Sequence, residues 1–453
     1  MSEYLLETCV GTKCVGCGSC MAVCPQDAIT VKTRSSLVQP TIDKSKCSRC
    51  DLCTENCSAF RNMYLEPTKP DFSRIIGRPL QTYIGFATSN LIRTNGASGG
   101  VTTALLTYLL DEEIIDYVVT AYQEKLVAQP LTITESKDLF KAQGSIYFPS
   151  FITKAARQII SEKGKCAFVG LPCQISSLRR LEAKSKKLRE RIHIYLGLFC
   201  SHTNEYWYLR YLSSRYSGVR CYPLTVSSRH GKWPGSTTLE TSCGSVTIPH
   251  PKFWGPIPLL HLSSPIGCLY CDNHMNIHSD IALGDAWLPR KTAEDDAGTS
   301  TVIAHTERGL TIIEDAKKKG HINLKEITLR TLIQSQLGNI VAKYNGVPIR
   351  RAIVRRQYRS KILGKYTVND MLIGLLPLIN SYLGQKGELR HTLFKHRISE
   401  KTLSLYQTLM QKMLLKATPN TIKKLLRFVV ETKDVGNANT DIRLRAQMKK
   451  TKR

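Results

Sequence analysis

The amino-acid sequence predicts an α/β protein in three parts: a small cysteine-rich module, a larger body with a mostly parallel sheet covered by helices, and a helical basic tail. Three observations support this prediction. Nine of the 16 cysteines lie within the first 57 residues. From Tyr83 onward, β-branched and aromatic runs alternate with helical segments, as in parallel sheets. From residue 390 onward, 16 Lys and Arg residues stand against four Asp and Glu.

The cysteine-rich module, residues 1–62, contains one spacing twice. Each run reads C-x2-C-x2-C-x3-C, and the runs are Cys14, Cys17, Cys20 and Cys24, then Cys47, Cys50, Cys53 and Cys57. In bacterial two-cluster ferredoxins, the fourth cysteine of each run ligates the other cluster. The spacing therefore predicts one 4Fe-4S cluster on Cys14, Cys17, Cys20 and Cys57, and a second on Cys47, Cys50, Cys53 and Cys24.

Zinc is the competing interpretation, because four-cysteine zinc sites also use C-x2-C pairs. The doubled run, with Pro25 after its first copy, favours clusters. Ser58 stands where a second proline would be usual, a departure that we expect to touch no ligand. Cys9 is expected to be a bystander thiol.

The next segments are a linker and the start of the body. Residues 63–80 contain three prolines and predict a linker, and the body is expected over 81–345. It opens with a strand at 83–88, a helix from Ser98 with apolar residues at helical spacing, and a strand at 114–122. The glycine-rich turn before Ser98 is either a phosphate site at a helix N-terminus or a tight turn capped by Ser98.

The rest of the body repeats this alternation. We expect helices over 151–160 and 174–183, strands at 166–170 and 192–200, and an irregular β-rich region over 220–255.

Four body cysteines follow or join these elements. Cys173 and Cys200 stand at the ends of two strands, and because the carboxyl ends of parallel strands share one edge, the two thiols should converge. Cys268 and Cys271 form a C-x2-C pair that could complete a four-thiolate set. Spacing alone leaves a 4Fe-4S cluster, zinc and unliganded thiols open, and the adjacent cluster module favours a cluster. Cys166, Cys221 and Cys243 are expected in the core.

Composition and the apolar segments bear on whether the chain folds and in which cell compartment it is expected. With 42% hydrophobic and 22% charged residues, the chain is expected to be folded. The N-terminal MSEYLLETCV lacks the basic residues and apolar stretch of a secretory signal, and the apolar stretch 371–383 is too short to span a bilayer. We therefore expect a cytoplasmic protein, in which clustered cysteines indicate metal ligation.

The basic tail, 346–453, includes a predicted amphipathic helix at 421–430 with Lys and Arg on one face. Such a helix packs on its own domain or contacts an acidic partner or a membrane surface peripherally. Removing residues 390–453 should release the protein from membranes if the tail binds lipid. No nucleic-acid-binding motif accompanies the charge, so nucleic acid is not an expected partner.

Seven body motifs occur in an order that resembles a known family. They are RTNGASGGVTTALLTYLLDEEIIDYVV, AQGSIYFPS, KCAFVGLPCQISSLRRL, YLGLFC, RHGKWPGS, GCLYCDNHMNIHSDIALGDAW and GTSTVIAHTERG. Together they resemble the beta subunits of coenzyme F420 hydrogenases and dehydrogenases over about residues 80–345. A ferredoxin module is a common N-terminal extension in that family.

The resemblance implies a subunit that binds FAD and exchanges hydride with the deazaflavin coenzyme F420. It implies that Cys173, Cys200, Cys268 and Cys271 hold a 4Fe-4S cluster beside the flavin. Implied flavin contacts are Ser98, Gly99, Gly100, Thr102, Thr103, Gly144, Ser145 and Tyr147. Asp280, Asp285 and Trp287 lie in a family motif and are expected to line the site, with Asp285 counted among the cofactor contacts. Arg93, Arg229 and Lys232 are either contacts for the acidic coenzyme or solvated charges.

These cofactors imply a chain of electron carriers. A hydride carries two electrons and a cluster accepts one, so a flavin is needed between them. The expected path runs from reduced F420 to FAD, the body cluster, the two clusters of the head module and a partner protein, with no catalytic protein residue. Two alternatives stay open. The same cofactors could serve another substrate, as in ferredoxin-linked reductases or bacterial polysaccharide-associated members, or the chain could be a non-catalytic electron-transfer subunit without FAD.

Overall fold

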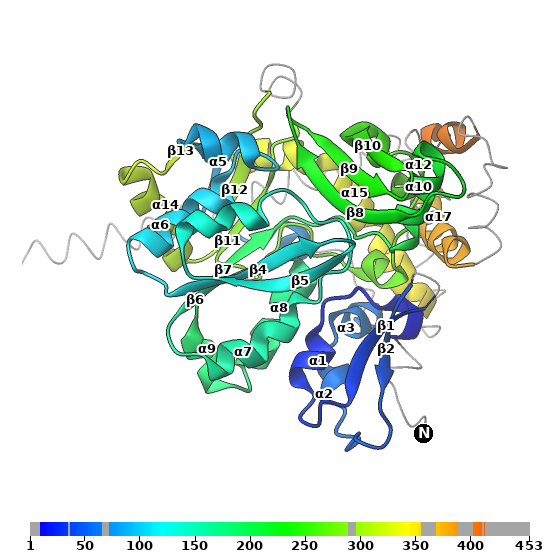
Figure 1. Ribbon diagram of the computed structural model, residues 1–453, viewed down its shortest axis with the longest axis horizontal. Helices are drawn as coiled ribbons and strands as arrows, with labels where there is room; N and C mark the ends of the chain where they lie inside the picture. Colours follow the sequence, from blue (N-terminus) through cyan, green and yellow to red (C-terminus); the bar gives the residue numbers. More distant parts are fainter. Residues whose placement is uncertain are drawn as a thin grey trace, which may run out of the picture.

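A computed structural model describes residues 10–34, 37–65, 72–288, 296–354, 368–386, 402–409 and 412. The predicted basic helix at 421–430 and Cys9 lie outside these ranges. Figure 1 shows a small N-terminal module, which we call the head, beside a larger body with a central sheet, a second smaller sheet, and helices that follow them in the sequence.

The head is built from one hairpin and three short helices. Strands β1 (Ile29–Arg34) and β2 (Leu37–Ile42) pair antiparallel. Helices α1 (Ser19–Val23) and α2 (Leu52–Asn56) are equivalent elements of the two cysteine runs, and each ends at the fourth cysteine of its run. Helix α3 (Ser58–Tyr64) follows Cys57 directly. The duplicated spacing thus produces duplicated local structure.

The body contains an eight-stranded sheet in the order β13-β3-β12-β11-β7-β6-β4-β5. The central strands β11, β7, β6 and β4 are parallel, and β3 runs in the same direction. Strands β5, β12 and β13 run in the opposite direction. The predicted mostly parallel sheet is therefore confirmed, with antiparallel strands towards both edges. The strand bounds are β3 Gln81–Ala87, β4 Tyr117–Glu124, β5 Val127–Ile133, β6 Cys166–Gly170, β7 Ile192–Leu198, β11 Ile281–Asp285, β12 Ser300–Ala304 and β13 Ile322–Glu326.

Helices cover both faces of this sheet (Figure 1). Alternate residues of β6 pack in opposite directions, because side chains along a strand point to alternate faces. Ala167 and Val169 join α6 (Val101–Asp111) and α14 (Glu307–Lys318) in one core. Phe168 joins α7 (Ala156–Ser161), α8 (Pro172–Glu182) and α9 (Lys186–Arg191) in the other.

A three-stranded antiparallel sheet packs beside the large one. Its strands are β8 (Pro223–His230), β9 (Ser236–Thr241) and β10 (Gly244–Pro249), as expected for the β-rich region 220–255. A disulfide joins Cys221 and Cys243, and Cys243 is exposed. The prediction that both are core thiols was wrong for Cys243, because it lies in the β9–β10 turn, whereas Cys166 is fully buried.

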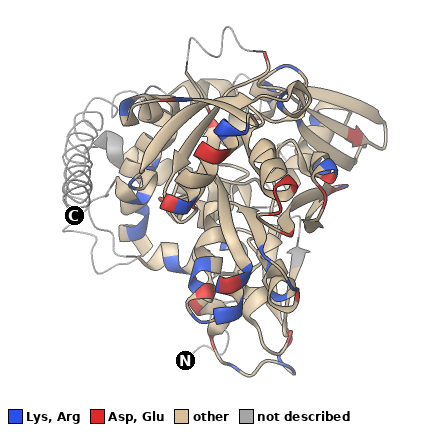
Figure 2. Ribbon diagram, turned by 90° about the vertical axis from the view of Figure 1, so that its left-hand side faces the viewer, with Lys and Arg blue, Asp and Glu red and all other residues tan. Residues whose placement is uncertain are grey.

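The helices after the sheets include two long ones. Helix α15 (Leu329–Val354) packs against α17 (Val368–Gly384) and against the loop that contains Cys268 and Cys271. No described helix is long and apolar enough to cross a membrane. Lys and Arg are interspersed with Asp and Glu over the face in Figure 2. The remaining elements are η2 Gly11–Lys13, α4 Ser73–Ile76, α5 Asn90–Asn95, η3 Ser136–Ala142, η4 Ile152–Ala155, α10 Trp207–Tyr216, α11 His250–Phe253, α12 Pro256–Leu259 and η5 Ile266–Tyr270.

Candidate functional site: a cavity joined to a row of thiols

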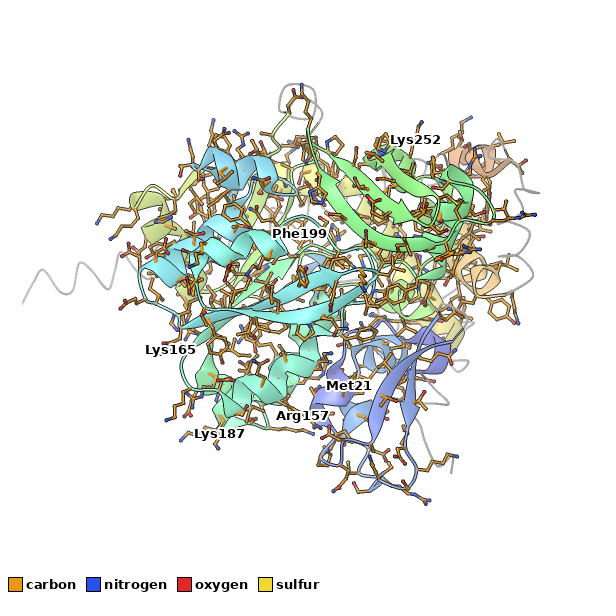
Figure 3. The ribbon with its side chains drawn as sticks, viewed as in Figure 1. Met21, Arg157, Lys165, Lys187, Phe199 and Lys252 are labelled. Atoms are coloured by element: carbon orange, nitrogen blue, oxygen red, sulfur yellow. A yellow bond between two sulfur atoms is a disulfide. The ribbon has the colours of Figure 1, made fainter. Side chains whose placement is uncertain are left out.

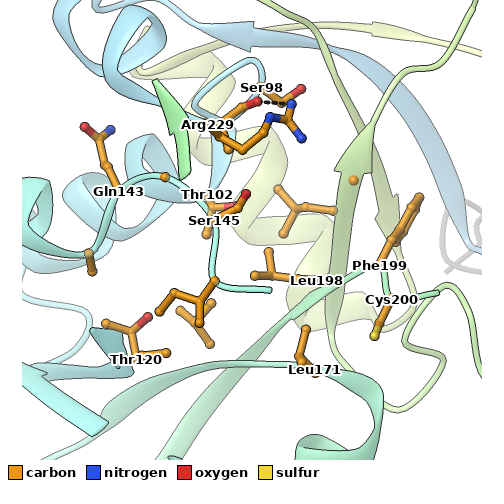
Figure 4. A pocket seen from close by; sticks show the side chains of 18 of the residues that line it. Ser98, Thr102, Thr120, Gln143, Ser145, Leu171, Leu198, Phe199, Cys200 and Arg229 are labelled. Atoms are coloured by element: carbon orange, nitrogen blue, oxygen red, sulfur yellow. Dashed lines mark hydrogen bonds between the residues drawn. The ribbon is translucent and has the colours of Figure 1, made fainter. Parts of the chain in front are cut away.

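A cavity of about 320 Å³ lies at the carboxyl edge of the parallel strands. This edge is where open α/β sheets usually bind ligands. Eight of the nine predicted flavin contacts line the cavity: Ser98, Gly100, Thr102, Thr103, Gly144, Ser145, Tyr147 and Asp285. Figure 4 shows Ser98 and Arg229 together at one end and Cys200 at the other.

Gly99 does not line the cavity, although it was grouped with the flavin contacts. A Cβ added at Gly99 would lie 2.6 Å from the Gly85 carbonyl oxygen and 2.8 Å from the Ser300 nitrogen. The glycine is therefore needed for close packing of the turn on β3 and β12. Its neighbour Gly100 has φ +74° and precedes α6, whose first residues, 101–103, line the cavity. The first N–H groups of a helix have no partner within the helix. Such a turn is suited to a phosphate.

Arg229 and Asp285 form a buried ion pair in the cavity wall. Two nitrogens of Arg229 donate to the two oxygens of Asp285 at 2.8 and 3.1 Å, and Arg229 also donates to the Tyr147 hydroxyl at 3.2 Å. Trp233 Nε1 donates to Asp285 at 3.0 Å. Burial raises the pKa of Asp285, but Arg229 outweighs burial and holds this pKa below its usual value. The ion pair thus keeps both side chains charged although they are buried in the wall of the cavity.

Three buried polar atoms of the cavity wall lack a hydrogen-bond partner within the described part of the chain. They are Gln143 Oε1, His202 Nε2 and Arg229 Nε. Burial, and then the charge of Lys343, lowers the pKa of His202 to about 3, so this imidazole is neutral at pH 7. Because buried polar groups are nearly always paired, the donor and acceptor chemistry of this wall fits a polar heteroaromatic ligand such as a flavin.

Four thiols gather at the Cys200 end of the cavity, and we call them the body set: Cys173, Cys200, Cys268 and Cys271. Cys173 lies in the first turn of α8, Cys200 follows β7, and the other two belong to η5 and its end. Burial, and then the charges of Cys17 and the other three members, raises the pKa of Cys173. The structure therefore brings together four thiols that sequence spacing could only suggest.

The head contributes a second group, the inner set, made of Cys14, Cys17, Cys20 and Cys57. Burial raises the pKa of Cys14, and Cys17 and Cys57 add to this shift. Burial and neighbouring thiols, Cys14 first, likewise raise the pKa of Cys20. These mutual effects, to which Cys53 adds at Cys20, indicate that the four thiols lie near one another. The crossed division of the eight head cysteines between two clusters stays a prediction.

The remaining head thiols, Cys24, Cys47, Cys50 and Cys53, are called the outer set. Cys24 is buried, whereas Cys50 is exposed. Burial raises the pKa of Cys53, and Cys50 adds a smaller contribution. Across the described residues, no three His, Cys, Asp or Glu side chains are grouped so as to hold a single metal ion. A four-iron cluster instead takes one thiolate at each iron of a cube, which needs wider spacing than one ion.

The inner set and the body set meet where the head packs on the body. Cys17 is the first neighbouring charge that raises the pKa of Cys173. Ser58 Oγ donates to the Cys173 carbonyl oxygen at 2.7 Å and accepts from Arg180 at 2.7 Å. Ser58 thus contacts the backbone of Cys173 and not its thiol, because the head folds directly against α8.

Further contacts extend this junction. Arg157 of α7 donates to the Ala22 carbonyl at 3.1 Å and pairs with Asp27, and Figure 3 shows it next to Met21 of the head. A Cβ at Gly267 would lie 2.1 Å from the Lys13 carbonyl oxygen, so the loop before Cys268 touches the head backbone.

Other residues singled out in the sequence lie away from the cavity. Asp280 is buried and has a structural role, because its carboxylate accepts hydrogen bonds from the Arg179 side chain and from the backbone N–H of Tyr195. Lys232 is 83% exposed and pairs with Asp296. Sequence reasoning missed Gln143 and His202, which stand next to the GSIY and LFC motifs, and proximity to those motifs was the signal that could have identified them.

Comparisons with known proteins agree with this geometry. The profile described as "Coenzyme F420 hydrogenase/dehydrogenase, beta subunit N-term" matches residues 82–157, and its C-terminal counterpart matches 163–330, together more than half of the chain. A 4Fe-4S dicluster domain profile matches residues 13–59.

Several curated relatives are similar. A coenzyme F420-dependent sulfite reductase of Methanocaldococcus jannaschii is 27% identical over 72% of this chain and 50% of its own length. One subunit of the F(420)H(2) dehydrogenase of Methanosarcina mazei is 26% identical over 44% of this chain and 56% of its own length. The chain thus spans only about half the length of these two relatives.

Two further proteins are similar over more of their own length. Coenzyme F420 hydrogenase subunit beta of Methanothermobacter thermautotrophicus is 27% identical over 53% of this chain and 82% of its own. A chain of the F420-reducing [NiFe] hydrogenase complex of Methanosarcina barkeri is 22% identical, with a TM-score of 0.45, over 58% of this chain and 90% of its own. From the profile matches and the ordered motifs, the chain belongs to the family of coenzyme F420 hydrogenase/dehydrogenase beta subunits and carries a 4Fe-4S dicluster domain in its head.

Proposed function

We propose that this chain is an iron–sulfur flavoprotein oxidoreductase that takes hydride from reduced coenzyme F420 and delivers electrons to a partner protein. The cavity would hold FAD, and the body, inner and outer sets would each hold one 4Fe-4S cluster. In this proposal residues 1–62 form the ferredoxin domain, 63–80 a linker, 81–345 the flavin and cluster domain, and 346–453 a helical extension.

The observation that carries this proposal is the continuity of the site. Cys200 belongs both to the cavity wall and to the body set. Cys173 of the body set neighbours Cys17 of the inner set. Cys50 of the outer set is exposed. Electrons entering at the cavity would therefore meet each thiol set in turn and reach the surface at Cys50.

The residues of the cavity have binding and shielding tasks in this scheme. A bound FAD would accept a hydride and release its electrons singly, which is chemistry that no side chain supplies. In this proposal the first turn of α6 would offer N–H groups to a phosphate. The cavity residues Gln143, His202 and Arg229, each with a buried polar atom that lacks a partner among the described residues, would hydrogen-bond to the ring system. Buried Leu283 and partly buried Phe199 limit water at the cluster end.

Coenzyme F420 is proposed as the hydride donor because the names of four similar proteins, whose named activities differ, all contain it. The relatives include a sulfite reductase, an F(420)H(2) dehydrogenase subunit, a hydrogenase subunit and a formate dehydrogenase subunit, and each of their names contains F420. Each of the four is similar to a part of this chain, over 44–72% of its length. We infer that this region handles the deazaflavin, while the second substrate is set by another protein or domain.

The test is anaerobic reconstitution with iron, sulfide and FAD, followed by stopped-flow mixing with reduced F420. We expect flavin bleaching first and cluster bleaching next. Bound FAD that dithionite reduces but reduced F420 does not would redirect the proposal to another substrate. Failure to bind FAD would identify a non-catalytic electron-transfer subunit. A Thr102→Val, Thr103→Val double variant should weaken FAD binding, and Thr94→Val, on the exposed helix α5, is the matched control.

A further inference from the structure

Helix α15 forms hydrogen bonds to the loop that contains two cysteines of the body set, Cys268 and Cys271. Three cationic side chains of this helix donate to three successive carbonyl oxygens of the loop. Arg350 Nη1 reaches Leu269 at 2.6 Å, Arg351 Nη2 reaches Tyr270 at 2.9 Å, and Lys343 Nζ reaches Cys271 at 2.8 Å. One helix therefore contacts the backbone of three of the four residues of the C-x2-C segment and brings three positive charges to it.

The three charges are not balanced in the same way. Arg351 pairs with the Asp272 carboxylate at 2.9 Å. Lys343 and Arg350 are buried, 7% and 4% exposed, and their hydrogen-bond acceptors among the residues that the structure describes are backbone carbonyls. A buried charge is costly unless an opposite charge accompanies it. An ammonium with three donors and one carbonyl acceptor is therefore incompletely compensated.

Lys343 is the cation that contacts a thiol-bearing residue of the body set directly. Its Nζ lies 2.8 Å from the carbonyl oxygen of Cys271, and its side chain is buried. The described contacts of Lys343 include no carboxylate, whereas Arg351 has Asp272 as its partner. A cluster on the body set would supply the negative charge that balances Lys343.

We propose that Lys343 is the counter-charge of the body cluster and raises the reduction potential of that cluster. The inference rests on the proposed function, because it requires a cluster on the body set. A four-thiolate cluster is anionic and gains one further negative charge on reduction. A fixed cation in a low-dielectric setting stabilises the reduced form more than the oxidised form, so the reduction potential rises.

Lys343 lies beyond the part of the chain that the family profile matches, which ends at residue 330, and it belongs to α15. A body cluster with a raised potential would accept electrons from the cavity more readily. Helix α15 would then contribute to the redox centre as well as to the packing of the fold.

The test is an EPR-monitored redox titration of the reconstituted full chain. Lys343→Met removes the charge at similar length, Lys343→Gln keeps a donor for the Cys271 carbonyl, and Lys343→Arg keeps the charge. Lys187→Met, an exposed lysine on α9 (Figure 3), is the matched control. The body cluster is recognised as the signal that Cys200→Ser removes, and the head clusters serve as internal references.

We expect Met and Gln at position 343 to change the oxidised-to-reduced ratio of the body cluster, at fixed potential, by about tenfold or more, equivalent to about 59 mV for one electron. The shift should be to lower potential, with the Arg variant and the control near wild type. Loss of the body cluster in both neutral variants, with retention in Lys343→Arg, would also support a required counter-charge.

Two different negative results are distinguishable. An unchanged body-cluster potential in Lys343→Met or Lys343→Gln would overturn the inference and leave the proposed function intact. Wild-type protein with iron and sulfide for two clusters would overturn the third cluster of the proposed function, and the role of Lys343 with it.

Discussion

The inner set of the head and the body set are both groups of four buried or half-buried thiols, but they are assembled differently. The inner set comes from one short module whose cysteine spacing is repeated. The body set comes from three separate segments, which the large sheet, α8 and η5 bring together. The comparison teaches that local spacing can specify a ligand set in a small module, whereas the body set depends on an intact tertiary fold.

The two sets also differ in their surroundings. The inner set is packed among apolar side chains of the head, such as Val15 and Ile29, with N–H groups of Gly16 and Phe60 directed at Cys14 and Cys57. The body set is enclosed by the cavity on one side and by α15 with Lys343 on the other. Substitutions of body residues around Cys200 or Lys343 should therefore alter a cluster on the body set and leave the head clusters intact.

The largest effect is expected from a substitution that removes a ligand of the body set and leaves the inner set unchanged. Cys200→Ser should abolish the body cluster, lower bound iron by about one third, and slow reduction of the head clusters by reduced F420 roughly 100-fold, because the path is cut at its first cluster. Iron analysis and stopped-flow absorbance measure these quantities. Cys166→Ala removes a buried thiol outside both sets and should leave them unchanged. Equal head-cluster rates in wild type and Cys200→Ser would refute the proposed order.

A second prediction concerns the body fold that assembles its thiol set. Arg229→Met leaves Asp285 without its cation, and loss of one partner of a buried ion pair costs about 3 kcal/mol. Urea unfolding should show this loss of stability, together with weaker FAD binding. The control, Lys232→Met, breaks an exposed pair with Asp296 and should leave the free energy of unfolding close to that of the wild type, because solvent screens exposed ion pairs. Similar losses in both variants would contradict the buried-pair interpretation.

Lowering the pH should destabilise the body through its buried histidines and spare the head in this respect, because the head, residues 1–62, contains no histidine. Burial lowers the pKa of His305 to about 4, below its usual value of about 6.5. The unfolded chain therefore binds more protons between these values, and stability falls as pH decreases through this window. His305→Gln should reduce that slope by about 1 kcal/mol per pH unit in urea titrations at pH 5 and 7. An unchanged slope would mean that His305 is not buried as a neutral group.

The smallest effect is expected at the junction itself. Ser58→Ala removes the hydrogen bond to the Cys173 carbonyl and should cost about 1 kcal/mol. The unfolding midpoint and the rate of electron transfer into the head both report on it. Ser45→Ala removes an exposed hydroxyl that bonds Asp43 and serves as control. If both substitutions have the same effect, Ser58 has no special role in docking.

Much of the fold was predictable because its signals are local. The strand at 166–170 coincides with β6, and the expected helix at 174–183 is α8, which begins two residues earlier. The antiparallel edges of the sheet were not predicted, since neither β12 nor β13 carries information about its neighbour across the sheet. The disulfide between Cys221 and Cys243 was also missed, because its two cysteines meet through the β8–β9–β10 hairpins.

The sequence by itself determined the two cysteine runs of the head, the α/β character of the body and the family motifs around the cavity. These depend on spacing within a few residues, where chain geometry leaves few alternatives. Only the tertiary structure decided that Cys200 lies between cavity and thiols, that Ser58 docks on Cys173, and that Lys343 reaches the body set from α15. Such contacts join residues tens to more than a hundred positions apart, and their formation depends on how whole layers pack rather than on local pattern.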